Sequence, residues 1–485
     1  MEKIYQFLTL LTLIIYWTTT AAITIRIITK RRAIGVSLAW MMLIFVLPFV
    51  GVVAYLMFGE LNLGRQRAAR ARQMFEPYSQ WFKRLHHWRQ YHPQLLSRYS
   101  ETITSLCEQR MGIPALADNM LQLLDTPQSI MDALIRDIHA AQHQIHMEFY
   151  IWYPGGMADD VANALIQAAK RGVTVRILLD TAGSRTFFNS HWPETLRHSG
   201  IQVAKALPVS PFRILFQRID LRLHRKIVVV DNEVAYTGSM NLVDPSYFKQ
   251  DAGVGQWIDV MIRLTGANVP VLNCIHAWDW EAETSERQLP SPPVLDPHTQ
   301  IDIKDIVQVI PSGPGMPEAM IQQVLLQSIY QARQRIVITT PYFVPSENLM
   351  FALVSAAQRG VEVDIIIPDK NDSMMVEWAS RSFFGELLRA GVNIHRFKGG
   401  LLHTKSVVID ERHCLIGTVN LDMRSLWLNF EVTLAVDDQQ FTQQLNQLQQ
   451  QYLADSSAID VNVWMKRKFH QRFIEQFFYW FSPLL

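Results

Sequence analysis

Residues 224–241 read HRKIVVVDNEVAYTGSMN, and residues 403–420 read HTKSVVIDERHCLIGTVN. Both segments follow one pattern: His-x-Lys, four residues, Asp, and then Gly-[Ser/Thr]-x-Asn after the same interval. Each contains an apolar run that predicts a buried strand. One such match can arise by chance, but two matches with the same internal spacing indicate a duplicated unit. A duplicated set of His, Lys and Asn side chains suits the chemistry of phosphodiesters.

The duplication extends beyond this motif. Residues 168–175 (AAKRGVTV) match residues 356–363 (AAQRGVEV), and each segment predicts a helix that ends at a glycine and leads into a buried strand. Residues 145–151 and 336–342 predict a further strand in each copy. We therefore expect an α/β fold with two similar halves packed around one active site.

The expected organisation has six segments. They are two transmembrane helices (1–60), a helical connector (61–110), a first half (111–283), a Pro-rich linker (284–300), a second half (301–455) and an amphipathic aromatic tail (456–485). The first half carries an insertion, residues 211–219 (PFRILFQRI). It suits either a core helix with solvated arginines or an interfacial segment whose arginines meet phosphates. We expect the tail to contact a membrane.

The first 60 residues contain two apolar runs, at about residues 7–25 and 33–58, with a basic cluster between them. Each run approaches the ~20 residues that a helix needs to cross a bilayer. A cleaved signal peptide is the alternative for the first run. The basic cluster follows that run, however, and a second apolar run takes the place of a polar mature start. We expect two retained helices that form a transmembrane hairpin, with Pro48 kinking the second.

The distribution of basic residues barely favours either side of the membrane for the catalytic body. A two-span hairpin places the amino end and the large remainder on one side, and basic residues are almost balanced between the two sides. Cys107, Cys274 and Cys414 are too far apart in the sequence to suggest a disulfide framework or a zinc site. Unpaired cysteines favour a cytoplasmic catalytic body. With 45 basic and 44 acidic residues, the chain has no charge excess that predicts a nucleic-acid partner.

The motif residues divide into roles that phosphodiester chemistry requires. Residues two apart on a strand share a face, so His224 lies with Lys226, and His403 lies with Lys405. One imidazole can attack phosphorus to form a phospho-histidine, while the other protonates the departing alkoxide and then activates the incoming alcohol. The lysines stabilise the charge that builds up on the phosphoryl oxygens. The expected phosphate-binding side chains are Asn241, Asn420, Ser239 and Thr418.

Four carboxylates accompany the motif. Asp259 and Glu431 lie in apolar segments at comparable positions after each motif, and we expect them to orient the histidines. Asp231 and Asp410 complete the catalytic motif. Because each ends its strand before a turn, a structural hydrogen-bonding role is favoured over direct catalysis. No clustered ligands suggest a metal, and we expect no cofactor.

The paired motifs resemble those of the phospholipase D superfamily over about residues 111–455. The amino-terminal hairpin, residues 238–244 (GSMNLVD) and residues 417–431 (GTVNLDMRSLWLNFE) resemble bacterial cardiolipin synthases more closely. That resemblance implies an inner-membrane phosphatidyltransferase that converts two phosphatidylglycerols into cardiolipin and glycerol. It also implies a phosphatidyl-histidine intermediate, for which we expect His224 to be the nucleophile.

Three alternatives remain open. A hydrolytic phospholipase D, or another phosphatidyltransferase, uses the same catalytic set and differs in its acceptor. A superfamily nuclease would need a basic groove, which the net charge of +1 and the membrane hairpin disfavour. A non-catalytic membrane scaffold would not need two intact motifs. The sequence does not predict the oligomeric state.

Overall fold

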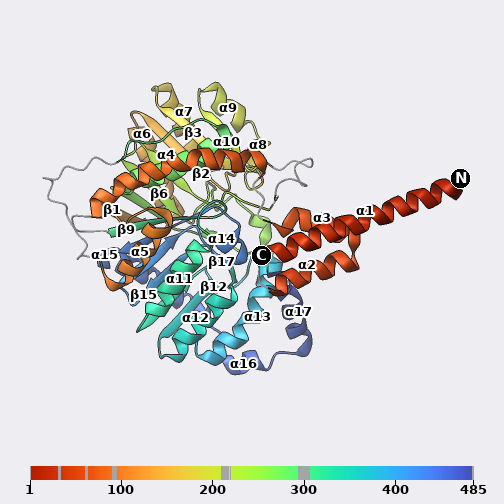
Figure 1. Cartoon of the computed structure of the whole chain (residues 1–485). Coiled ribbons are helices and arrows are strands. Elements are labelled where there is room, and N and C mark those ends of the chain that lie inside the picture. Colours follow the sequence, from red (N-terminus) through yellow and green to blue (C-terminus); the bar gives the residue numbers. More distant parts are fainter. Residues whose placement is uncertain are drawn as a thin grey trace. The chain divides into compact units, whose positions relative to one another are not determined.

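The computed structural model describes residues 2–30, 34–60, 64–89, 96–208, 218, 220–292 and 306–482. These residues form two compact units. The first consists of the described parts of Met1–Ala69 and Val209–Leu221, and the second consists of those of Arg70–Pro208 and Arg222–Leu485. Apart from residues 209–221, both halves of the sequence repeat lie in the second unit. Figure 1 shows the strands and helices of both halves.

The first half is built on a seven-stranded sheet in the order β1-β8-β6-β5-β2-β3-β4. Strands β2, β3 and β4 are parallel, and every other pairing in this sheet is antiparallel. The strands are β1 (Asn119–Leu124), β2 (Gln144–Phe149), β3 (Thr174–Asp180), β4 (Gln202–Ala206), β5 (Ile227–Val230), β6 (Val234–Gly238) and β8 (Met261–Gly266).

The second half repeats this arrangement in an eight-stranded sheet, in the order β19-β13-β12-β10-β15-β16-β18-β9. Apart from the added edge strand β19, each strand takes the place of its counterpart in the first sheet, with β15 matching β5. The fold prediction of two similar α/β halves is confirmed. The strands are β9 (Ile306–Ser312), β10 (Arg335–Thr339), β12 (Glu362–Pro368), β13 (Asn393–Phe397), β15 (Ser406–Ile409), β16 (His413–Gly417), β18 (Glu431–Asp437) and β19 (Ser456–Ala458).

Helices cover both faces of each sheet, as expected for buried strands. One shared apolar cluster includes α10, α15 and strands from both halves, with Val229 and Leu272 in the same cluster as Val408 and Leu445. Separate clusters fill the remaining face of each sheet. The helices are α6 (Pro127–Ala140), α7 (Met157–Lys170), α8 (Arg185–Phe188), α9 (Trp192–His198), η3 (Gln250–Ala252), α10 (Val269–Thr284), α11 (Met320–Gln331), α12 (Glu347–Gln358), α13 (Met374–Ala390), α14 (Met423–Trp427), α15 (Gln439–Ala454), α16 (Val461–Met465) and α17 (Phe469–Tyr479).

The two halves are also joined through their backbones. Strand β7 (Trp257–Ile258) of the first half pairs in parallel with β14 (Leu401–Leu402) of the second. A parallel bridge joins Leu223 to Phe430. Both junctions lie next to a motif histidine, so contacts between the halves position the motif. A short two-stranded sheet, β11 (Phe343–Val344) with β17 (Leu421–Asp422), lies within the second half.

The connector forms two helices, α4 (Arg65–Arg89) and α5 (Arg98–Met111). Two other expected segments are described only in part. The insertion at residues 211–219 lies outside the described residues except for Arg218, which pairs with Asp220 at 2.6 Å. The linker is described only as far as residue 292.

The first unit contains α1 (Glu2–Thr29), α2 (Ile34–Val46), α3 (Pro48–Ala54) and the π-helical turn η1 (Tyr55–Gly59). Among the described residues, α1 is the one helix long and apolar enough to cross a membrane. The second apolar run breaks at Leu47, whose φ and ψ are −125° and 76°. Pro48 causes this break because it has no N–H and disfavours a helical conformation at the preceding residue. The second run is therefore two short helical pieces rather than one continuous span.

Candidate active site

Each motif histidine lies in an extended segment that leads into a strand. The sequence predicts His-x-Lys on the strand itself, but β5 begins at Ile227 and β15 begins at Ser406. The reason is that the histidine backbones bond to the opposite half instead of to their own sheet. The His224 amide donates to the Phe430 carbonyl at 2.9 Å, and the His403 amide donates to the Ile258 carbonyl at 2.8 Å.

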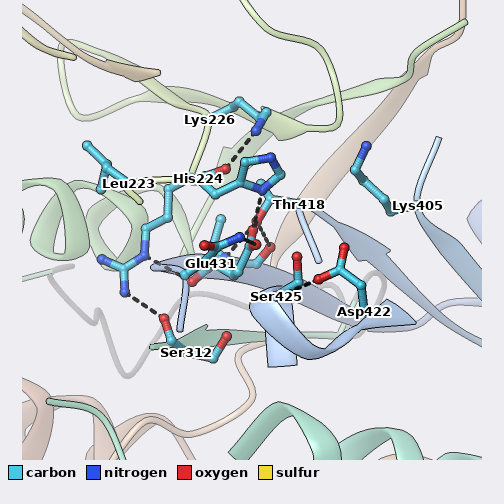
Figure 2. A network of polar contacts seen from close by, with 12 residues as sticks. Leu223, His224, Lys226, Ser312, Lys405, Thr418, Asp422, Ser425 and Glu431 are labelled. Atoms are coloured by element: carbon cyan, nitrogen blue, oxygen red, sulfur yellow. Dashed lines mark hydrogen bonds and ion pairs between the residues drawn. The ribbon is translucent and has the colours of Figure 1, made fainter. Parts of the chain in front are cut away.

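The two histidine-orienting carboxylates are exchanged between the halves. His224 Nδ1 lies 2.8 Å from Glu431 Oε2, and His403 Nδ1 lies 2.7 Å from Asp259 Oδ1 (Figure 2 shows the His224 pair). The sequence predicts that both acids orient histidines but not which histidine each acid contacts. Because a carboxylate accepts, each Nδ1 carries the proton, and the free lone pair of each neutral ring is left on Nε2.

Burial decides the charge of both imidazoles. It lowers the pKa of His224 to about 4, although Glu431 opposes this effect. It likewise lowers the pKa of His403 to about 4 against the influence of Asp259. Burial works to raise the pKa of Asp259, but His403, Lys405 and Ser239 together lower it to about 2. Near neutral pH the site therefore holds two neutral imidazoles, each donating to an ionised carboxylate.

The motif lysines are buried with the histidines. Lys226 Nζ donates to the His224 carbonyl at 2.7 Å, and Lys405 Nζ donates to that of His403 at 2.5 Å. In Figure 2 the two lysine side chains flank the His224 ring, and both lower the pKa of that ring. Burial lowers the pKa of Lys226 to about 8 and that of Lys405 to about 7. The two ammonium groups offset the charges of Glu431 and Asp259, and an anion bound beside them would favour the protonated form of both lysines.

The expected phosphate-binding hydroxyls lie behind the carboxylates. Ser239 Oγ donates to Asp259 at 2.6 Å, and Thr418 Oγ1 donates to Glu431 at 2.5 Å. Each hydroxyl proton thus holds an orienting acid, which differs from the phosphate contact expected from the sequence. Asn241 Oδ1 accepts from the Ile151 amide at 3.1 Å. Among the described residues, Asn420 Oδ1 is buried without a hydrogen-bond partner.

The motif aspartates lie at the far end of their strands, outside the histidine site. Asp231 accepts hydrogen bonds from the amides of residues 142–144 at 2.7–2.8 Å. Asp410 accepts from the amides of residues 333–335 and from the Tyr99 hydroxyl. Each aspartate thereby fixes the start of the neighbouring strand, β2 or β10. The four residues of β5 separate Asp231 from the His224 segment by roughly 13 Å.

Aromatic rings line the histidines, and sequence analysis assigned them no role. The Tyr150 ring centroid lies 5.1 Å from that of His224, and the Trp257 centroid lies 4.4 Å from that of His403. Tyr342 also approaches His403, with 6.4 Å between the ring centroids. The available signals were two strands that end in aromatic residues and a tryptophan two positions before Asp259. These rings contribute to the burial of both imidazoles, which leaves His224 7% and His403 2% exposed.

Two arginines and an aspartate complete the surroundings and were also missed. Arg222 and Arg424, one from each half, both act electrostatically on Tyr150. Asp180 accepts from the Leu223 amide at 2.9 Å, immediately before His224. Burial raises the pKa of Asp180 to about 6. No local sequence pattern distinguished these three from ordinary surface or strand-end residues.

Comparison with known proteins agrees with this geometry. The family described as "Cardiolipin synthase, PLD-like domain" matches residues 134–258 and 325–453, and the one described as "Phospholipase D-nuclease N-terminal" matches residues 20–60. Proteins named cardiolipin synthase A from Yersinia pseudotuberculosis serotype O:3 (strain YPIII) and Yersinia pestis are each 51% identical to the chain over 487 residues, covering 100% of both partners.

A solved structure shares the fold. Phosphatidylserine synthase from Haemophilus influenzae Rd KW20 superposes with a TM-score of 0.59 at 16% identity, covering 79% of this chain and 98% of that one. The matched family segments contain both histidines and the strands that carry the motif. The sequence-based prediction of the family is confirmed. The chain belongs to the cardiolipin synthase family of phospholipase D-like phosphatidyltransferases.

Proposed function

We propose that the chain transfers a phosphatidyl group between two phosphatidylglycerol molecules and releases cardiolipin and glycerol. The observation that carries this proposal is the exchange of Glu431 and Asp259 between His224 and His403, which makes the two half-motifs parts of one buried centre. Family membership supports phospholipid substrates. No nucleic-acid partner is expected at a net charge of +1.

In the first step, Nε2 of His224 attacks the phosphorus of one phosphatidylglycerol. The bond from phosphorus to the glycerol oxygen breaks, and His403 protonates that oxygen as glycerol leaves. We assign the nucleophile to His224, whose side chain is 9% exposed, against 3% for His403. An imidazole with a pKa of about 4 is a poor acid at neutral pH, but a bound phosphodiester anion stabilises its protonated form.

In the second step, His403 takes the proton from the terminal hydroxyl of another phosphatidylglycerol. That oxygen attacks phosphorus, the bond to His224 breaks, and cardiolipin is released. One phosphodiester replaces another, so the exchange is close to neutral in energy and needs no nucleotide. The aromatic rings beside both imidazoles help to keep water from the intermediate.

Charge on the phosphoryl oxygens requires donors, and the site offers several. Lys226 and Lys405 are buried cations beside the histidines, and the amides of Asn241 and Asn420 are further candidates. Ser239 and Thr418 contribute by fixing the orienting carboxylates. Preorganised donors of this kind act strongly in a buried site because no solvent needs to reorganise around them.

Membrane attachment belongs to the same proposal. We place the protein in the bacterial inner membrane with its catalytic body on the cytoplasmic side.

The carboxyl-terminal helix α17 supplies a second contact with lipid. Glu475 faces inward and pairs with Arg381 at 3.1 Å and Arg467 at 2.8 Å. The outward face carries aromatic residues with exposed fractions of 53–83%: Phe469, Phe473, Phe477 and Trp480. Such a face fits the interfacial region of a bilayer.

A product assay tests the function. Purified full-length protein is mixed with phosphatidylglycerol vesicles, and the lipids are separated and identified by mass spectrometry. Cardiolipin and glycerol in equal amounts are expected. Phosphatidic acid without cardiolipin would identify a hydrolase. Lipid turnover that is unchanged in both His224→Ala and His403→Ala would leave a scaffold as the better account.

A further inference from the structure

The second apolar run folds back on itself. The Trp40 and Tyr55 ring centroids lie 5.4 Å apart, and a Cβ added at Gly51 would lie 2.7 Å from Ile44 Cα. Residue numbers in both pairs add to the same total, which is the signature of an antiparallel hairpin centred on Leu47 and Pro48. The absent Cβ of Gly51 permits this close approach of α3 to α2.

The returning arm of this hairpin runs alongside α1 and in the same direction. Tyr16 contacts Phe49 with a ring separation of 6.2 Å, and farther along, Arg26 pairs with Glu60 at 2.6 Å. Tyr55 also donates to Glu60 at 2.8 Å. Glu60, the residue that follows the returning arm, therefore lies beside the carboxyl-terminal end of α1. The chain enters and leaves the α2–η1 hairpin at the same end of α1.

Neither arm of the hairpin is long enough to cross a bilayer. The 13 residues of α2 extend about 20 Å, and residues 48–59 extend about 18 Å, against ~30 Å of hydrocarbon. The 28 residues of α1 extend about 42 Å, and Figure 1 shows its amino-terminal half projecting beyond α2 and α3. Among the helices described in this unit, only α1 has the length to cross.

The turn of the hairpin has the chemistry of a segment surrounded by hydrocarbon. Its residues Val46, Leu47, Phe49 and Val50 are apolar and 49–67% exposed. The Leu47 amide donates to the Leu43 carbonyl at 2.9 Å, and the Leu47 carbonyl accepts from Gly51 at 2.6 Å. Pro48 has no N–H that needs a partner. The turn thus exposes side chains that lipid favours and leaves few backbone donors open.

We propose that α1 crosses the membrane once, while α2, α3 and η1 enter the hydrocarbon and return on the same face. The amino terminus then lies on the opposite side from the catalytic body. This topology also gathers the basic residues on the body side: Arg26, Lys30, Arg31, Arg32, Arg65, Arg67, Arg70 and Arg72. Lys3 stands alone on the other side. The positive-inside rule then assigns the body to the cytoplasm without the near tie of a two-span hairpin.

Single cysteines can test this topology, because Cys107, Cys274 and Cys414 are buried and should resist labelling. Glu2→Cys, Lys30→Cys and Lys170→Cys are introduced at exposed positions and treated with a membrane-impermeant maleimide in spheroplasts and in inverted vesicles. The proposal predicts that Lys30→Cys and Lys170→Cys react only in inverted vesicles, whereas Glu2→Cys reacts only in spheroplasts. Two full spans would instead place Glu2→Cys with Lys170→Cys, and Lys30→Cys opposite them.

Leu47→Cys tests the hairpin turn. The proposal predicts protection from the impermeant reagent in both preparations, with labelling only after the membrane is dissolved. Labelling of Leu47→Cys in spheroplasts would mean that the run reaches the far side, which overturns the proposal. The readout is independent of catalysis, so failure of the product assay does not affect it. Thermal unfolding of each variant, compared with the unmodified protein, serves as a control for folding.

Discussion

At the scale of single residues, we expect the carboxylates of Glu431 and Asp259 to determine which imidazole nitrogen reacts. Glu431 and Asp259 each accept the Nδ1 proton of a histidine from the other half. Thr418 and Ser239 hold these acids in turn. An amide in place of the acid can present its NH2 group to Nδ1, which favours the tautomer with the proton on Nε2. That tautomer has no lone pair on Nε2 for attack.

Glu431→Gln and Asp259→Asn should therefore lower kcat on the order of 10³-fold or more while the protein stays folded. The measurement is steady-state cardiolipin formation alongside thermal unfolding. The matched control is Asp438→Asn, which changes an acid that caps α15 away from the site and should leave kcat intact. An unchanged kcat in both site variants would contradict the assigned role.

The lysines predict the alkaline limit of activity. The pKa of Lys405 is lowered to about 7 and that of Lys226 to about 8, so the empty site loses positive charge as pH rises through this range. We expect kcat/KM for phosphatidylglycerol to fall above about pH 7–8. The acid limit should lie near pH 4, where His224 gains a proton and loses the lone pair that attacks phosphorus.

Lys405→Arg separates this explanation from others, because arginine keeps its charge throughout. If the variant retains activity, its alkaline limit should move to higher pH. An alkaline limit that stays in place in an active Lys405→Arg enzyme would show that another group controls it. Measuring kcat separately adds a check, since bound phosphate should raise the pKa of both lysines.

At the scale of elements, the motif aspartates stabilise strands. Asp231→Ala would leave the amides of residues 142–144 without their acceptor at the start of β2. Of these three hydrogen bonds, only the one from the Gln144 amide is partly buried. The expected loss of unfolding free energy is therefore that of one buried group left unpaired, about 1–3 kcal/mol. Calorimetry should show a lower Tm, whereas kcat per folded molecule should change little. A large fall in kcat at unchanged Tm would restore a catalytic role.

Helix α17 should insert its aromatic face into lipid. A spin label at Phe473→Cys is expected to meet oxygen more readily than a water-soluble nickel chelate when the protein is in vesicles. A label at Met120→Cys, an exposed apolar position on the edge strand β1, serves as the control and should show the reverse. Equal exposure of both labels to the chelate would exclude membrane contact by α17.

The elements also show what the sequence could and could not predict. The strands that follow His224 and His403 were predicted from a repeated apolar run, which reports burial directly. The sequence does not predict that Asp259 and Glu431 each bond the histidine of the other half. Both acids follow their motifs at similar spacing, and this spacing does not show which half supplies the acid for a given histidine. The sequence predicts that the second apolar run spans the membrane, because hydropathy shows how many apolar residues follow one another. It does not show whether the chain reverses its direction within them. Its reversal depends on Pro48 and on the contact at Gly51.

At the scale of the molecule, neither half forms a complete site alone. Each supplies a histidine, a lysine and the acid that orients the other half's histidine. The pairing of β7 with β14 and the bridge from Leu223 to Phe430 hold both segments in register. This arrangement explains why two motifs occur in one chain, and it leads us to expect a single covalent intermediate on His224.

The most direct test of this account is the capture of the phosphatidyl-histidine intermediate. A phosphatidyl ester with an aryl leaving group that departs without a proton is mixed with each variant, quenched with alkali and digested for mass spectrometry. His403→Ala should accumulate a phosphatidyl group on His224, because the base for the second step is missing. His224→Ala should carry none. A phosphatidyl group found on His403 would contradict the account. Failure to find a phosphatidyl-histidine in any of these proteins while they consume the substrate would also contradict it.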